Sequence, residues 1–339
     1  MKSLLFALLI SLAVAGCTGG RPGPEGGAVE LLNVSYDPTR ELWRDINAHF
    51  IPHYENQTGV RLSIRQSHGG SSTQARAVID GLEADVVTLA SFLDIDALRQ
   101  RGLIADGWVE RLPHNSLPYF STIVFVVRKG NPKGLKDWSD LVKPGVEIIT
   151  PNPKTSGNGY MTFFSAWGSV VLRGGSRQDA VDFVTKLYRQ VPVLDSGARA
   201  AAATFVQRGI GDVHLAWENE AHLEAREAKG ELDLIYPPIS IRAEPHVAVV
   251  DANVDRRNTR AAAEAYLTYL YTDEAQEIIA RHFYRPINEV ILKKHAIFPE
   301  MKLFSITDIA KDFADAHRQF IGDGGVFDSI LKTKRGSGS

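Results

Sequence analysis

The feature that most constrains the fold is a regular alternation of short β-rich runs with segments of helical pattern. Apolar and β-branched runs predict strands at 30–35, 60–64 and 85–90. Helical patterns follow each of them, at 38–54, 72–82 and 93–101. Strands that alternate with helices in this way form mainly parallel sheets covered by helices on both faces. The sequence therefore predicts an α/β fold.

The alternation restarts after a long β-rich run at 121–132, which predicts a second lobe. The strands expected there are 146–150, 191–195, 212–217 and 232–236, and the helices begin at Gly159, Gln178, Arg199 and Asn219. A proline-bounded segment at 237–245 suits a return crossover, and helical patterns at 258–271 and 273–282 would complete the first lobe. Two lobes joined by two crossovers form a hinged central cleft, where ligands favour binding.

These patterns predict an ordered series of segments. We expect a signal peptide at 1–16, a flexible linker at 17–28, a first lobe from 29–118 plus 243–300, a second lobe at 119–242, C-terminal helices at 301–332 that pack on the lobes, and a disordered tail at 333–339.

The N-terminus carries an export pattern. Met1 and Lys2 precede an apolar run that is short for a membrane span and ends in small residues before Cys17. Small residues directly before a cysteine are typical of a bacterial lipoprotein signal, which predicts a periplasmic protein tethered through a lipidated Cys17. The alternative is an ordinary secretory signal with an incidental cysteine. Cys17 is the only cysteine, so no intramolecular disulfide can form.

Charge and motifs argue against several function classes. The net charge of −2 provides no basic field for nucleic acid. No zinc-protease, nucleophile-elbow or phosphate-loop motif is present, so we predict no catalytic residue, cofactor or metal. His68 is interpreted as a structural or rim histidine. Carboxylates and a histidine at 218–224 have a spacing that can hold a metal, but a solvated charged helix face is the preferred interpretation.

Four junctions between strands and helices share one chemistry. They read VSYDPTRE, SHGGSST, PNPKTSGNGY and LDSGARAAAATFVQRG. The beginning of a helix has unpaired N–H donors and a partial positive charge, and such ends bind anions. The glycine-rich junction has no lysine, unlike a phosphate loop. We therefore expect an anion held by neutral donors, with purely structural capping as the alternative.

These strings, with ADVVTLA, STIVFVVRKGNPKGLKDWSDLVKPGV and HLAWENEA, resemble the sulfate-binding proteins of bacterial ABC importers. The resemblance spans about 30–331 in matching order. It implies a two-lobed periplasmic-binding-protein fold that closes on dehydrated sulfate. It implies backbone donors at Asp37, Ser71, Gly157, Asn158 and Ala198, a hydroxyl donor at Ser156 and an indole donor at Trp217.

Three of these positions leave alternatives open. Trp217 ends an apolar strand and could serve only core packing. The Asp37 carboxylate is expected to cap its helix while its N–H faces the anion. Many members of the family have glycine where Asn158 stands, although a backbone donor survives that difference. Arg199 either adds positive charge from behind the site or forms a structural ion pair.

The resemblance also implies partners, namely sulfate and an ABC permease with its ATPase. The protein would be a monomer that meets the membrane only through its N-terminal lipid. Thiosulfate or another tetrahedral oxyanion is the nearest alternative ligand. An exported hydrolase of sulfate or phosphate esters and a sulfate sensor are alternatives of other classes.

Overall fold

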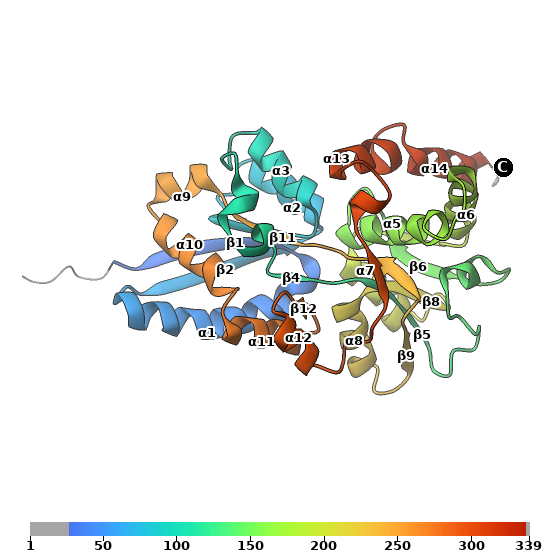
Figure 1. Ribbon diagram of the computed structural model, residues 1–339, viewed down its shortest axis with the longest axis horizontal. Coiled ribbons are helices and arrows are strands. Elements are labelled where there is room, and N and C mark those ends of the chain that lie inside the picture. The colour runs from blue at the N-terminus through green and yellow to red at the C-terminus, as the bar shows by residue number, and fades with distance from the viewer. Residues whose placement is uncertain (1–26, 337–339) are drawn as a thin grey trace, which may run out of the picture.

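The computed structural model describes residues 27–336, and it places the elements in two lobes, each built on its own sheet (Figure 1). The predicted signal peptide, Cys17 and most of the predicted linker lie outside the described residues. The two-lobed α/β architecture expected from the sequence is confirmed.

The sheet of the first lobe has the strand order β11-β3-β1-β2. Its strands are β1 (Val29–Tyr36), β2 (Leu62–Gly69), β3 (Val86–Leu89) and β11 (His246–Val249). Strand β1 pairs in parallel with both β2 and β3, whereas β11 is antiparallel to β3. The helices of this lobe are α1 (Arg40–Thr58), α2 (Ser71–Ile79), α3 (Phe92–Gln100), α4 (Pro113–Ser116), α9 (Asp251–Arg257), α10 (Arg260–Tyr269), α11 (Asp273–Arg281) and α12 (Glu289–Lys294), with the 3₁₀ turns η1 (Asp37–Thr39) and η2 (Trp108–Arg111).

The sheet of the second lobe has the order β7-β6-β8-β5-β9. Its strands are β5 (Ile123–Arg128), β6 (Ile148–Pro151), β7 (Leu194–Asp195), β8 (Val213–Trp217) and β9 (Leu232–Ile235). Its helical elements are η3 (Trp138–Val142), α5 (Gly157–Val171), α6 (Arg177–Arg189), α7 (Ala198–Ala202), the π-helix η4 (Ala203–Gln207) and α8 (Glu218–Glu227).

The sheet of the second lobe is mainly parallel, as predicted, because β6, β7, β8 and β9 run in one direction and β5 alone runs against them. Strand β6 is parallel to β7 and β8, but β5 is antiparallel to both β8 and β9. Strand β5 is the strand by which the chain enters this lobe from the first one, so it runs opposite to the strands of the following β-α-β units. A period-2 apolar pattern carries no information about strand direction.

Short pairings join the lobes. Strand β4 (Tyr119–Phe120) pairs with β12 (Arg285–Pro286), and an isolated antiparallel bridge joins Ser121 to Ala243, so the outgoing and returning segments run side by side. Within the predicted return crossover, β10 (Ile239–Ile241) is a strand that pairs with β13 (Lys302–Phe304).

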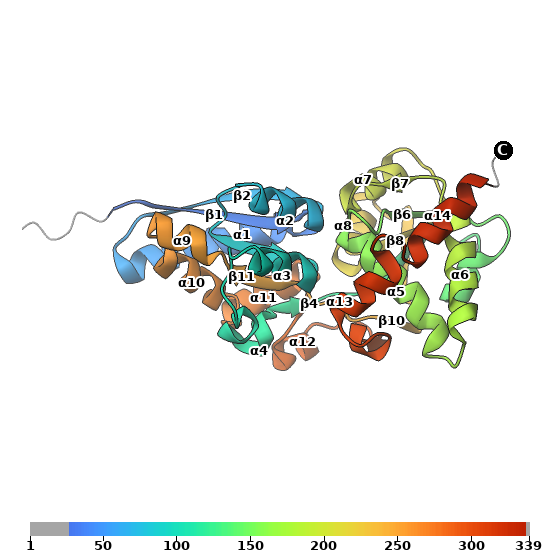
Figure 2. The same ribbon diagram turned by 90° about the horizontal axis from the view of Figure 1, so that it is seen from above.

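The C-terminal segment packs on the second lobe and also reaches the first. Its elements are β13, η5 (Ile306–Asp308), α13 (Phe313–Ala316), the π-helix η6 (His317–Ile321) and α14 (Val326–Gly336). Phe320 lies 4.6 Å from the Trp167 ring of α5, whereas Phe313 stacks on Phe92 of α3 at 5.3 Å. Figure 2 shows this segment lying over the second lobe, with α13 at the edge that faces the first lobe.

Helix α14 includes 333–336, so the predicted disordered tail is wrong for those residues. The stretch from 332 to 335 has neither glycine nor proline to end a helix, and its lysine and arginine residues suit a helix C-terminus. Among the described residues, no helix has both the length and the apolar character needed to cross a membrane.

Candidate functional site

The four strand-to-helix junctions of the sequence meet between the two lobes. A Cβ atom on Gly70, before α2, would lie 2.7 Å from the carbonyl oxygen of Thr155, before α5. One on Gly197, before α7, would lie 3.1 Å from Asp37 Oδ2, before α1. At Gly70 only glycine allows the two backbones to approach this closely, whereas at Gly197 a Cβ atom would crowd the Asp37 side chain. The loops that precede α1 and α2 in the first lobe therefore face those that precede α5 and α7 in the second.

The first-lobe junctions present backbone groups, because their side chains are already engaged. The hydroxyl of Ser71 donates to Asp94 Oδ2 at 2.5 Å and accepts from the N–H of Ala90 at 3.0 Å. The carboxylate of Asp37 accepts from Arg40 Nη2 at 2.9 Å. Burial raises the pKa of the Asp94 carboxyl, which the Ser71 hydroxyl partly offsets.

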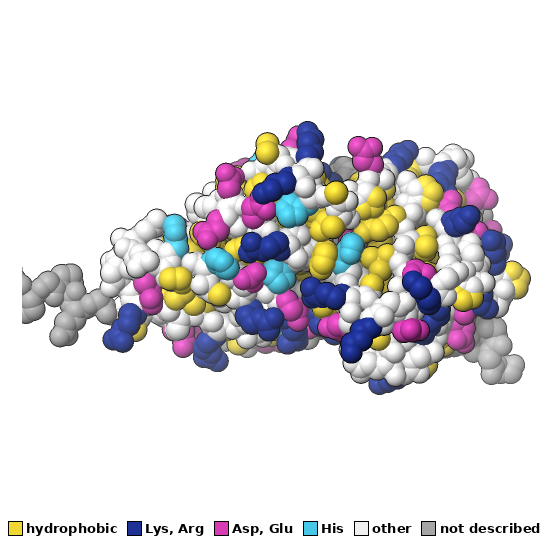
Figure 3. Space-filling view, turned by 90° about the horizontal axis from the view of Figure 1, so that it is seen from below, with side chains coloured by type: hydrophobic (Ala, Val, Ile, Leu, Met, Phe, Trp, Pro, Cys, Tyr) yellow, Lys and Arg dark blue, Asp and Glu magenta, His cyan; other side chains and the backbone are white. Residues whose placement is uncertain are grey.

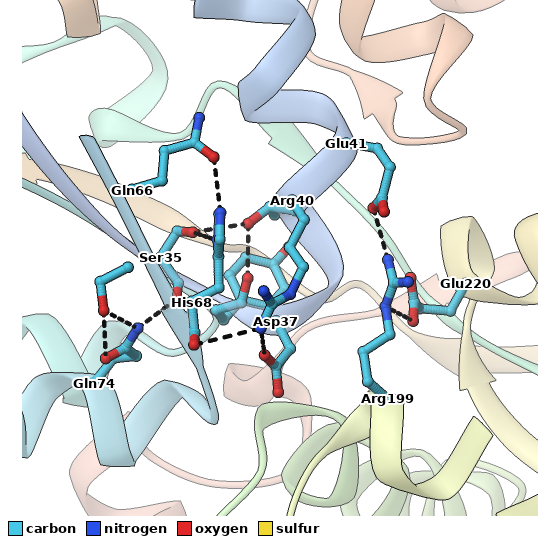
Figure 4. Close-up of polar contacts among 12 residues, drawn as sticks. Ser35, Asp37, Arg40, Glu41, Gln66, His68, Gln74, Arg199 and Glu220 are labelled. Carbon is cyan, nitrogen blue, oxygen red and sulfur yellow. Dashed lines mark hydrogen bonds and ion pairs between the residues drawn. The ribbon is translucent and has the colours of Figure 1, made fainter. Parts of the chain in front are cut away.

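The expectation that the Asp37 carboxylate caps its helix is wrong. A 3₁₀ turn, η1, comes before α1, and neither helical element has a side-chain cap of its own N-terminus. Pro38 does stand in the first turn of η1, where its missing N–H costs no hydrogen bond. The carboxylate turns instead to Arg40, one helical turn further along (Figure 4).

The second-lobe junctions open two helices. Ser156 is the N-cap of α5, and its Oγ accepts from the N–H of Gly159 at 3.5 Å, which leaves the hydroxyl hydrogen for another acceptor. Gly157 and Asn158 stand in the first turn, where backbone N–H groups have no partner within the helix. Ala198 begins α7 and is nearly buried.

Trp217 ends β8 beside these junctions. Its side chain is fully buried, 5.9 Å from the Tyr36 ring of the first lobe. A Cβ atom on Gly157 would lie 3.8 Å from Cζ2 of its indole. The indole thus lies beside the first turn of α5, whose backbone N–H groups have no partner within the helix.

Arg199 joins the two lobes. Its Nη2 lies 2.6 Å from Glu41 Oε2 on α1, and its Nε lies 2.8 Å from Glu220 Oε2 on α8 (Figure 4). Burial raises the pKa of Glu220 to about 8, against the opposing effect of Arg199. The Glu41 carboxylate of the first lobe pairs with this guanidinium and Glu220, mostly protonated at pH 7, lies on its other side, so the ion-pair interpretation accounts for the position of Arg199 in the structure.

His68 occupies a hydrogen-bonded structural position. Its Nδ1 lies 2.6 Å from Ser35 Oγ and its Nε2 lies 2.8 Å from Gln66 Oε1 (Figure 4). Partial burial lowers the pKa of His68 to about 4, so the ring is neutral at pH 7. A neutral ring donates through Nε2 and accepts at Nδ1 from the Ser35 hydroxyl, with no nucleophile activated.

The prediction of a solvated charged face at 218–224 is wrong. Glu218, Glu220 and Glu224 are all buried. Glu218 binds Arg285 of β12 through two contacts, at 2.7 and 2.8 Å, and Glu224 pairs with His214 at 3.0 Å. Helix α8 begins where the lobes meet, so its first turn is enclosed. No group of these residue types in 27–336 could hold a metal ion.

A cavity borders the second-lobe junctions. It has a volume of about 720 Å³ and lies between the lobes and the C-terminal segment. Its lining includes Ser156, Gly157, Asp94, Tyr160 and His317. The region where the loops converge is thus accessible from this side.

The structure places all seven predicted donors in these converging junctions or at the end of β8. Sequence reasoning missed the residues that hold the site from behind: Tyr36, Glu41, Tyr284 and Arg285. Tyr284 accepts from Asn219 Nδ2 of the second lobe at 2.9 Å and donates to the carbonyl of Pro38. No local pattern marks such residues, because their partners lie far away in the chain.

Known proteins are similar to this chain along most of its length. The family model "Bacterial extracellular solute-binding protein" matches residues 43–285. The sulfate-binding protein of Salmonella typhimurium is 52% identical over 307 residues, which is 90% of this chain and 93% of that protein. The thiosulfate-binding protein of Pseudomonas aeruginosa is 50% identical over 333 residues, with 97% and 99% covered.

The solved structure of the sulfate-binding protein SubI from Mycobacterium tuberculosis has the same fold. It aligns with a TM-score of 0.78 at 30% identity, covering 86% of this chain and 99% of that one. These relatives confirm the resemblance that the sequence strings indicate. The chain belongs to the bacterial extracellular solute-binding proteins.

Proposed function

We propose that the protein captures sulfate outside the cytoplasm and delivers it to an ABC permease. The observation that carries this proposal is that the four strand-to-helix junctions meet between the lobes, with the Trp217 indole beside the first turn of α5. Sulfate accepts hydrogen bonds and donates none, so a site of donors alone satisfies it.

The proposed donors are the backbone N–H groups of Asp37, Ser71, Gly157, Asn158 and Ala198, the hydroxyl of Ser156 and the indole of Trp217. Hydrogen bonds to charged groups contribute about 1.5–3 kcal/mol each. Donors held by helix ends need little reorganisation, and exclusion of water by the closed lobes strengthens each bond. Arg199 is proposed to stand behind this set rather than to contact the anion.

The lobes are proposed to move as 29–118 with 243–300 against 119–242, about the two paired connecting segments. Helices of 301–332 would follow the second lobe, since most of their apolar side chains belong to its core. Contacts across the cleft, such as Arg199 with Glu41, would form only when the lobes close.

The partners proposed for the protein are a membrane permease and its ATPase. The protein would act as a periplasmic monomer, tethered to a membrane through acylated Cys17. Figure 3 shows one face of the molecule, on which charges of both signs are interspersed and hydrophobic side chains gather near its middle. This mixed charge agrees with a partner other than nucleic acid.

Isothermal titration calorimetry with sulfate, thiosulfate, molybdate and phosphate tests the proposal. We expect tight binding of sulfate, with thiosulfate as the second candidate because one close relative carries that name. Tight binding of thiosulfate alone would move the assignment to that ion. Absence of binding of any of these anions, with turnover of a chromogenic sulfate or phosphate ester, would favour the hydrolase alternative.

A further inference from the structure

Strand β8 is longer than its pairing with β6, which lies along one of its edges. Its parallel pairing with β6 ends where Ile149 stands opposite His214. The carbonyl of Leu215 and the N–H of Trp217 therefore need other partners. Both residues are fully buried, and unpaired backbone groups in such a place are costly.

The side chain of Asn158 supplies both partners. Its amide oxygen accepts from the Trp217 N–H at 3.0 Å, and its amide nitrogen donates to the Leu215 carbonyl at 3.0 Å and to Thr162 Oγ1 at 3.3 Å. In the opposite orientation the amide nitrogen would face the Trp217 N–H and the amide oxygen would face the Leu215 carbonyl, so neither hydrogen bond could form. A side-chain amide has the same groups as a peptide bond, so Asn158 continues the hydrogen-bond ladder that β6 leaves.

We infer that the side chain of Asn158 is a positioning residue, which fixes the end of β8 and thereby orients the indole of Trp217 toward the bound anion. This inference rests on the proposed function, and it is separate from the proposed role of the Asn158 backbone N–H. The junction that offers N–H groups to the anion would also hold the aromatic donor in place.

The other contacts of Trp217 do not replace the hydrogen bonds of the Asn158 amide. The Trp217 ring centroid lies 5.9 Å from that of Tyr36, and a Cβ atom on Gly157 would lie 3.8 Å from its Cζ2. Asn158 is itself 1% exposed, so no water substitutes easily for its side chain. A glycine at 158 would keep the backbone donor but leave the Leu215 carbonyl and the Trp217 N–H without these partners.

A double-mutant cycle in sulfate affinity separates positioning from other effects. Asn158→Ala should weaken sulfate binding by about tenfold, the size of one lost bond to a charged ligand. In a Trp217→Phe background the same substitution should change affinity by less than about twofold, because the indole donor is already gone. Full additivity of the two substitutions would overturn the inference. Thr162→Val is the matched control, since it removes the third contact of the amide and spares β8.

Hydrogen exchange of the Trp217 backbone amide tests, without ligand, the clamp by which the Asn158 side chain holds the end of β8. In Asn158→Ala, followed by NMR of the unliganded protein, exchange should accelerate by about tenfold or more, because the N–H loses its buried acceptor. Thr162→Val should leave it unchanged. Equal exchange in Asn158→Ala and wild type would overturn the clamp even if sulfate binds.

Sulfate affinity and hydrogen exchange together distinguish failure of the proposed function from failure of this inference. Wild-type protein that does not bind sulfate would contradict the proposed function and the orienting role with it, while exchange still decides whether Asn158 holds β8. If Asn158→Ala does not fold, Asn158→Ser takes its place, because a serine side chain is too short to span both backbone groups.

Discussion

Gly157 of the second lobe meets Ala90 of the first lobe so closely that a Cβ atom on Gly157 would lie 2.5 Å from the Cβ atom of Ala90. Gly157 begins α5 of the second lobe and Ala90 directly follows β3 of the first lobe, so they meet where the lobes face each other. The space between Gly157 and Ala90 therefore determines whether the lobes can close around an anion.

Gly157→Ala should weaken sulfate binding by preventing full closure. Overpacking costs about 1–3 kcal/mol, which is roughly a fivefold to more than hundredfold loss of affinity. The measurement is calorimetric titration, with small-angle scattering to detect a more open protein. Gly27→Ala is the control, because nothing lies within 4 Å of a Cβ atom there. Equal affinity of Gly157→Ala and wild type would show that the lobes do not need this contact.

Trp217→Phe keeps an aromatic ring and deletes the indole N–H. Loss of one bond to a charged ligand, about 1.5–3 kcal/mol, should weaken sulfate binding roughly tenfold to a hundredfold. Thermal unfolding should show that the variant is folded. If its sulfate affinity matches wild type, Trp217 serves core packing alone.

Sulfate should be preferred strongly over phosphate. Near neutral pH phosphate keeps a proton, and a buried P–O–H without an acceptor costs about 1–3 kcal/mol, to which the clash of two donors adds. Two carboxylates of these junctions already accept hydrogen bonds, Asp37 from Arg40 and Asp94 from Ser71. Competition calorimetry should show feeble displacement by phosphate. Comparable affinities for the two anions would mean that an acceptor faces the site.

Sulfate affinity should also change little between about pH 6 and pH 7, because none of the proposed donors titrates there. Near pH 8 the charge beside Arg199 begins to change, since the pKa of Glu220 is about 8. A steep change of affinity between pH 6 and pH 7 would contradict the neutral-donor site.

Glu220→Gln should change how stability depends on pH. The pKa of Glu220 is raised from the ordinary 4.5 to about 8, so the folded protein holds a proton that the unfolded chain has released. Stability from this group is present below about pH 4.5 and is lost as pH rises toward 8. The free energy of unfolding of wild type minus that of Glu220→Gln should therefore fall between pH 5 and pH 8, at up to ~1.4 kcal/mol per pH unit.

Subtraction of the variant is needed because several histidines, His317 among them, have the opposite effect. Burial lowers the pKa of His68, His222 and His246 to about 4, and lowered histidine pKa values make stability rise with pH over that range. Both proteins share these groups, so their contribution cancels. A wild-type minus variant difference that stays constant from pH 5 to pH 8 would contradict the raised pKa of Glu220.

Cys17 should be acylated after cleavage between Gly16 and Cys17. Intact-mass analysis of membrane-extracted protein should show a chain that begins at Cys17 and carries the mass of acyl groups. Cys17→Ser is the control, and it should prevent the modification. A mature protein with a free Cys17 thiol, or one cleaved elsewhere, would support the ordinary secretory signal instead.

The sequence by itself predicted the two lobes and the four junctions, because those features follow local rules. Period-2 and helical patterns identify strands and helices within a few residues, and glycine, serine and proline mark where helices begin. The strings around Ser71, Ser156 and Trp217 also sufficed to predict the family, since the family model and relatives match the chain along most of its length. The donor positions stay a prediction.

Only the tertiary structure decided which residues hold the junctions together. Arg199 and Glu41 are 158 positions apart and Glu218 and Arg285 are 67 apart, so no local pattern relates them. The direction of β5 and the burial of α8 depend on how the chain enters and leaves the second lobe. The Asn158 clamp depends on where β6 stops pairing with β8. The physical reason is the same in each case: hydrogen bonds and burial join groups that are near in space, whereas a sequence pattern reports only on neighbours along the chain.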